Sequence, residues 1–155
     1  MADSPREPDR IASFAAVLGV FASGVGAAAL YGRVTGRQLP ERVAPLDVAL
    51  GALATFKFTR MIAKDAVTTP LRAPFTQFEE NIGAGEVMES PKPGHPQHTI
   101  GDLLSCPFCL APWVSTSYVA TLALAPRLAR AWAAAFSVVA LSDSLQFGYD
   151  QLKEL

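Results

Sequence analysis

The chain has 155 residues, of which 50% are hydrophobic and only 17% charged, and its formal net charge is -1. This length is typical of one domain, but a water-soluble domain usually carries about a quarter charged residues. The balanced charge argues against a nucleic-acid partner, which needs a basic surface, and two cysteines are too few for a disulfide-stapled secreted protein. We therefore expect an all-α integral membrane protein with the lipid bilayer as its main partner.

The N-terminal region is expected to hold a polar tail and the first membrane span. Residues 1–10 are polar and mixed in charge, which predicts disorder, whereas residues 11–31 are uncharged and close to the ~20 residues needed to cross a bilayer. A signal peptide is the alternative, because Ala27-Ala28-Ala29 resembles a cleavage site, but the run exceeds the ~7–15 residues of that segment. Small residues give this helix a face for another protein or a second copy: Gly19, Ser23, Gly24, Gly26 and Ala28.

A second span is expected at residues 44–63, with Pro45 in a position that favours a helix start. Lys57, Arg60 and Lys64 follow one another at i, i+3 and i+7, so they lie on one helix face. Their long side chains either reach up to the lipid headgroups or point into the helix bundle and need a partner.

The chain then leaves the helix, because the residues before Pro70 and Pro74 disfavour helical angles. Arg72, with the aromatic residues near it, suggests a segment at the membrane interface with Arg72 among the phosphates. Residues 79–102 are polar and rich in proline and glycine, which predicts a mobile loop between the second and third spans.

Two further spans are expected at residues 103–125 and 128–147, separated by a turn at Pro126-Arg127. Four spans place both termini and the long loop on one side of the membrane. That side has eight lysines and arginines and the other has five, namely Arg33, Arg37, Arg42, Arg127 and Arg130. The excess predicts that the termini and the loop are cytoplasmic.

This topology predicts a polar cluster at the loop side. The second and fourth spans run in the same direction, and Arg60 and Asp143 each lie about 15 residues into their spans, at one depth of ~22 Å. An acid inside a span normally needs a partner, so we expect an Arg60–Asp143 ion pair. The cluster is predicted to gather near the cysteines and to contain Lys57, Arg60, Lys64, Arg72 and Asp143.

The two cysteines, Cys106 and Cys109, open the third span as a Cys-x-x-Cys pair. They suit three uses: a redox pair whose thiolate is favoured at a helix N-terminus, a zinc site completed by His95 and His98, or plain packing. Packing is the leading hypothesis, so no cofactor is expected, and zinc is the alternative.

Three stretches together resemble a known family: ATFKFTRMIAKD at 54–65, TPLRAPF at 69–75 and CPFCL at 106–110, with Trp113. The family comprises small bacterial integral membrane proteins catalogued as a domain of unknown function, some of them named as sporulation proteins. The resemblance covers roughly residues 45–149. It implies a multi-span helical protein of the bacterial plasma membrane and implies no activity.

These observations favour a non-enzymatic membrane protein that serves as a structural or protein-interaction component. A thiol-redox or metal-binding component that uses Cys106 and Cys109 is the first alternative. A small transporter subunit is the second, because Lys57, Arg60 and Asp143 lie inside expected spans.

Overall fold

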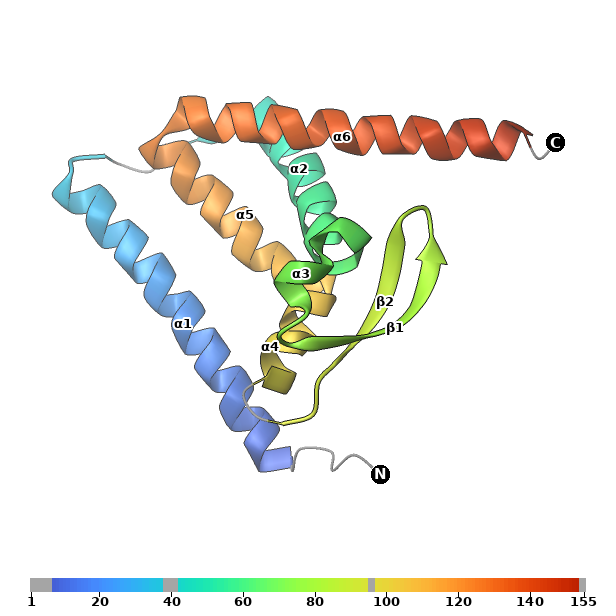
Figure 1. Cartoon of the computed structure of the whole chain (residues 1–155). Helices are drawn as coiled ribbons and strands as arrows, with labels where there is room; N and C mark the ends of the chain where they lie inside the picture. The colour runs from blue at the N-terminus through green and yellow to red at the C-terminus, as the bar shows by residue number, and fades with distance from the viewer. Residues whose placement is uncertain (1–6, 38–41, 95–96, 154–155) are drawn as a thin grey trace.

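The computed structural model describes residues 7–37, 42–94 and 97–153. Within these ranges it has six α-helices: α1 (Glu7–Val34), α2 (Pro45–Lys64), α3 (Thr69–Arg72), α4 (Gln97–Ser105), α5 (Pro107–Leu124) and α6 (Pro126–Lys153). A 3-10 turn, η1 (Ala66–Thr68), precedes α3, and two antiparallel strands, β1 (Thr76–Gly83) and β2 (Glu86–Pro91), form one hairpin (Figure 1). The protein is therefore mostly helical, as expected, with a small hairpin in addition.

In the described part of the chain, three helices are long and apolar enough to cross a membrane, judged by length and composition: Asp9–Val34 within α1, α5 and α6. They correspond to the first, third and fourth expected spans. The expected helix at 44–63 also forms, as α2, but it is not one of these three because it carries Asp47, Lys57, Arg60 and Lys64. Of the polar tail expected to be disordered at 1–10, residues 7–10 belong to α1, since a proline is tolerated in the first helical turn, and residues 1–6 lie outside the described residues.

Helix α2 lies at the centre of the fold and packs against both α5 and α6. Ala54 of α2 and Ala133 of α6 are completely buried, and these small side chains let the two helices approach closely. Tyr118 of α5 fits over Gly51 of α2, where an added Cβ would come within 2.3 Å of the tyrosine ring. Phe58 adds edge-on ring contacts with two aromatic residues of α6.

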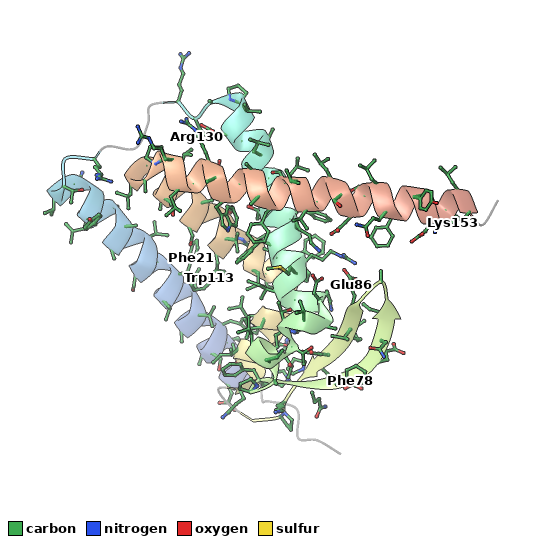
Figure 2. All side chains as sticks on the ribbon, turned by 45° about the horizontal axis from the view of Figure 1, so that its top comes forward. Phe21, Phe78, Glu86, Trp113, Arg130 and Lys153 are labelled. Atoms are coloured by element: carbon green, nitrogen blue, oxygen red, sulfur yellow. The ribbon has the colours of Figure 1, made fainter. Side chains whose placement is uncertain are left out.

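Helix α1 is peripheral. It runs beside α5 (Figure 1), and its Phe21 meets Trp113 of α5 edge-on, with ring centroids 5.0 Å apart (Figure 2). The second half of α6 extends beyond the other helices (Figure 1) and exposes Leu145 and Phe147. Much of the apolar surface of both helices therefore faces outward.

The segment 79–102 is not the loop that its composition predicted. Most of it forms the hairpin and the start of α4, because Ala84 and Gly85 join the strands in a two-residue turn. Both residues have positive φ angles, 48° and 76°, as a type I′ hairpin turn requires. The Gly83-Ala84-Gly85 run between two stretches with β-forming residues was the sequence signal for this hairpin. The expected span 103–125 is also divided, since α4 ends at Ser105 and α5 begins at Pro107.

Candidate functional site

A buried ion pair joins the end of α2 and α3 to the hairpin. The side chain of Arg72 is 0% exposed and that of Glu89, on β2, is 1% exposed. Arg72 donates from Nε to Oε2 and from Nη2 to Oε1 of Glu89, both at 2.9 Å. This two-pronged geometry is the strongest form of an arginine–carboxylate contact.

The remaining polar atoms of this pair are also hydrogen-bonded. Arg72 Nη1 donates to the carbonyl of Ile62 at 2.5 Å and to Thr68 Oγ1 at 2.6 Å, which helps to satisfy the carbonyls that a helix end leaves free. Thr69 and Thr76 each donate a hydroxyl hydrogen bond to Glu89. Burial acts to raise the pKa of the Glu89 carboxyl, but the hydrogen bonds from Arg72, Thr76 and Thr69 outweigh it and hold that pKa below its ordinary value.

The prediction that Arg72 lies among lipid phosphates is therefore wrong. A guanidinium that is completely buried and paired with Glu89 is not available to a headgroup or to a cysteine thiolate. The sequence missed this pair because Glu89 belonged to the segment expected to be a mobile loop.

Lys57 and Arg60 lie near the end of α2, where Lys57 and not Arg60 contacts Asp143. Lys57 Nζ lies 2.9 Å from Asp143 Oδ2 on α6 and 3.4 Å from Asp65 Oδ2. Arg60 instead forms two hydrogen bonds of 2.7 Å with Glu86, at the start of β2. The expected Arg60–Asp143 pair is thus wrong, because the hairpin brings a carboxylate directly to Arg60.

Lys64 is the remaining member of the expected cluster. Its Nζ lies 3.9 Å from Met88 Sδ on β2, so it also faces the hairpin. The hairpin and α6 thus divide the residues of the expected cluster among separate contacts.

A second ion pair ties the beginning of α2 to α6. Arg130 donates to both carboxylate oxygens of Asp47 at 2.9 and 2.8 Å, and Tyr118 donates its hydroxyl to the Asp47 carbonyl at 2.9 Å. The Asp47–Arg130 and Lys57–Asp143 pairs follow the same chain order in both helices, so α2 and α6 run in the same sense. The sequence offered one signal for this ion pair, because Asp47 and Arg130 each lie near the start of an apolar run.

The cysteine pair lies at the N-terminus of α5. Cys106 is the N-cap residue, and its Sγ accepts a hydrogen bond from the Cys109 amide at 3.2 Å. The two Sγ atoms are 2.6 Å apart and both cysteines are free. The Cys-x-x-Cys spacing at the start of α5 therefore brings the two thiols together.

The histidines show no zinc site in the part of the chain that the structure describes. His95 lies outside the described residues. His98 Nδ1 lies 3.2 Å from Asp102 Oδ2, one turn along α4. The described ranges contain no group of three or more histidine, cysteine or acidic side chains placed to hold one metal ion.

The buried polar side chains of the fold are paired with one another or with the backbone. Among the described residues, every buried side-chain nitrogen and oxygen has a hydrogen-bond partner. Asp47, Lys57, Arg60, Arg72 and Asp143 all take part in ion pairs. These pairs join elements of the fold, and Lys57 and Asp143 also line a cavity of about 460 Å³ between α2, α6 and the hairpin.

Comparison with known proteins gives one family. The family model described as "Protein of unknown function (DUF1360)" matches residues 50–149. No curated protein and no solved structure matches the chain. The match runs from α2 to α6, so it includes the buried ion pair, the hairpin and the cysteine pair, and it excludes α1. Because the match covers well over half of the chain, this protein belongs to the DUF1360 family of proteins of unknown function.

Proposed function

We propose that this DUF1360 protein is a non-enzymatic, membrane-embedded scaffold that serves as a structural or protein-interaction component. The observation that carries the proposal is that the charges of α2 are used within the fold. Lys57, Arg60 and Asp47 all form ion pairs with α6 or the hairpin, whereas the outer faces of α1 and α6 are apolar. Charges that are already paired across the fold favour a structural role, because a transported ion or a substrate would have to break these pairs.

The proposed location is a bacterial plasma membrane, with four spans and with the termini and hairpin on the cytoplasmic side. Helix α2 is the second span in this arrangement, in addition to the three helices that are apolar enough to cross a membrane. Its charges are compatible with a membrane because partners within the fold neutralise Lys57 and Arg60. Helix α6 is inclined to α1 and α5 (Figure 1), and its 28 residues exceed the ~20 needed, so it can cross at a tilt.

The Lys57–Asp143 pair provides the test. We would replace the two residues singly, as Lys57→Met and Asp143→Leu, and together, and measure the amount and thermal stability of protein extracted from washed membranes. Lys57→Met should lose protein because it leaves Asp143 without a cation, Asp143→Leu should lose less because Lys57 keeps Asp65 at 3.4 Å, and the double variant should recover relative to Lys57→Met. Lys153→Met is the matched control, since Lys153 forms an exposed pair with Asp150 and should change nothing.

Two experimental results would contradict the scaffold proposal. Protein that washes off membranes in alkaline carbonate contradicts the membrane location. A double variant that is abundant and stable but does not complement a deletion strain would show that the charges act in transport or chemistry, which is the transporter alternative.

Thiol redox is the second candidate function, and the proximity of Cys106 Sγ and Cys109 Sγ at the N-terminus of α5 favours it. In this function the two thiols would form one disulfide and give two electrons and two protons to a partner disulfide, which becomes a dithiol. Thiol titration of detergent-purified protein before and after a disulfide reagent tests it, because a bond that forms and is reduced again under mild conditions supports redox work. Elemental analysis of the same sample for zinc tests a metal site with His98.

A further inference from the structure

The structure contains an apolar groove between α1 and α5. Its volume is about 650 Å³, within the range of about 300–1,000 Å³ for small-molecule sites. Alanines from the two helices, Ala28 and Ala29 on one side and Ala120 and Ala123 on the other, line its walls. Their small side chains keep the helices from filling the space between them. The groove therefore exists because alanines of α1 face alanines of α5.

One end of this groove is basic. Arg33 and Arg37, at the end of α1, line it together with Leu124 at the end of α5. The helices meet further back, where Phe21 contacts Trp113 (Figure 2). The groove thus combines a long apolar wall with a cationic mouth.

The end of α1 holds the two arginines at this mouth through a glycine-dependent cap. Gly36 has a φ of 67°, its amide donates to the Arg33 carbonyl at 3.2 Å, and the Arg37 amide donates to the Gly32 carbonyl at 2.8 Å. These two bonds form a Schellman motif. They turn the chain back over the helix end and place Arg37 beside the groove that Arg33 also lines. They also satisfy carbonyls whose partial negative charge would oppose an anion at this position.

The surroundings of the mouth are also positively charged. Arg42 precedes α2, and Arg127 and Arg130 lie in the first turns of α6, at the same end of the fold as Arg33 and Arg37. Arg130 is already paired with Asp47. The charge at this end therefore complements a negatively charged ligand.

We propose that this groove binds an anionic phospholipid, with one acyl chain along the α1–α5 wall and its phosphate at Arg33 and Arg37. The inference rests on the membrane location proposed above. Guanidinium groups bind phosphate through paired hydrogen bonds, and lipid phosphates lie at the level of helix ends in a bilayer. A soluble phosphate would use the arginines but would leave the apolar wall unused, which is why the lipid is the ligand.

Native mass spectrometry of the full chain would test this proposal. The protein is purified in mild detergent and mixed with equal amounts of phosphatidylglycerol and phosphatidylcholine of identical acyl chains. Wild type should retain phosphatidylglycerol preferentially. In the double variant Arg33→Gln/Arg37→Gln the ratio of retained phosphatidylglycerol to phosphatidylcholine should fall about five- to twenty-five-fold, since each arginine contributes to binding of an anionic headgroup. Both arginines are exposed, so folding should be retained.

Two further variants separate the mouth from the wall. Arg127→Gln is the matched control, because Arg127 is an exposed arginine at the same end that does not line the groove, and it should lose far less of the preference than the double variant. Ala120→Phe fills the wall and should reduce the binding of both lipids.

The possible outcomes distinguish this inference from the proposed function. Equal retention of the two lipids by wild type, or an equal loss in Arg127→Gln and the double variant, overturns the groove proposal while the membrane location stands. Displacement of the lipid by millimolar inorganic phosphate would show a simple anion site and also overturns it. Failure of the protein to stay in carbonate-washed membranes overturns the proposed function itself.

Discussion

Arg72 and Glu89 form a buried two-pronged ion pair between residues that lie 17 positions apart in the chain. Arg72 also donates to carbonyls at the end of α2, so one side chain fixes that helix end, α3 and β2 together. A buried pair of this kind gives little net stability over an apolar pair, but breaking it is costly. Its effect is to give the hairpin one defined position against the helices.

Removal of the Glu89 charge should destabilise the protein strongly. Glu89→Gln leaves the Arg72 guanidinium buried without a counter-charge, and we expect a loss of about 3–5 kcal/mol in the free energy of unfolding. The double variant Arg72→Met/Glu89→Leu should lose less than Glu89→Gln alone. Denaturant unfolding in detergent, followed by circular dichroism, measures both. Glu80→Gln, an exposed position on the same hairpin, is the control, and a loss as large in this variant would contradict the prediction.

The same pair predicts how stability depends on pH. The pKa of Glu89 is lowered in the folded protein relative to about 4.3 in an unfolded chain. Its contribution to stability is therefore complete above that unfolded value, and it is lost as the pH falls towards and through the folded pKa. Thermal melts between pH 7 and pH 3 should show a steeper loss for wild type than for Glu89→Gln. Parallel curves for the two proteins would show that another carboxyl is responsible.

Gly51 should not tolerate a larger side chain. In Gly51→Ala the new Cβ would lie 2.3 Å from the Tyr118 ring, and the ring is held by its hydrogen bond to the Asp47 carbonyl. Overpacking of this kind costs about 1–3 kcal/mol, which a lower melting temperature in detergent should report. Gly24→Ala in α1 is the matched control, because nothing lies within 4 Å of its new Cβ. That variant should be neutral or gain up to about 1 kcal/mol of helix propensity.

The hairpin turn can be improved. Ala84 has a φ of 48°, a left-handed conformation that disfavours residues with an ordinary Cβ and suits asparagine or glycine. Ala84→Asn should therefore stabilise the hairpin by about 0.5–1 kcal/mol, and Ala84→Val should destabilise it. Hydrogen exchange of the amides of β1 and β2 is the direct measurement. An unchanged or faster exchange in Ala84→Asn would show that this turn does not limit the stability of the hairpin.

The sequence by itself determined where the long helices lie and that the two thiols are close. An apolar run of about 20 residues forms a helix through local hydrogen bonds. Proline marks the first residue of three of these helices, at Pro45, Pro107 and Pro126. Cys106 and Cys109 are one helical turn apart, so their proximity also follows from spacing alone. The family resemblance rests on the same local patterns.

Only the tertiary structure decided which charges pair. Arg60 meets Glu86, Arg72 meets Glu89 and Lys57 meets Asp143, and two of these partners belong to a hairpin whose polar composition resembles that of a loop. A carboxylate attracts any cation of similar reach, so its partner depends on how the hairpin and α6 fold against α2. Charge and spacing along the chain placed the cations on one helix face, but the packing of distant segments selected their partners.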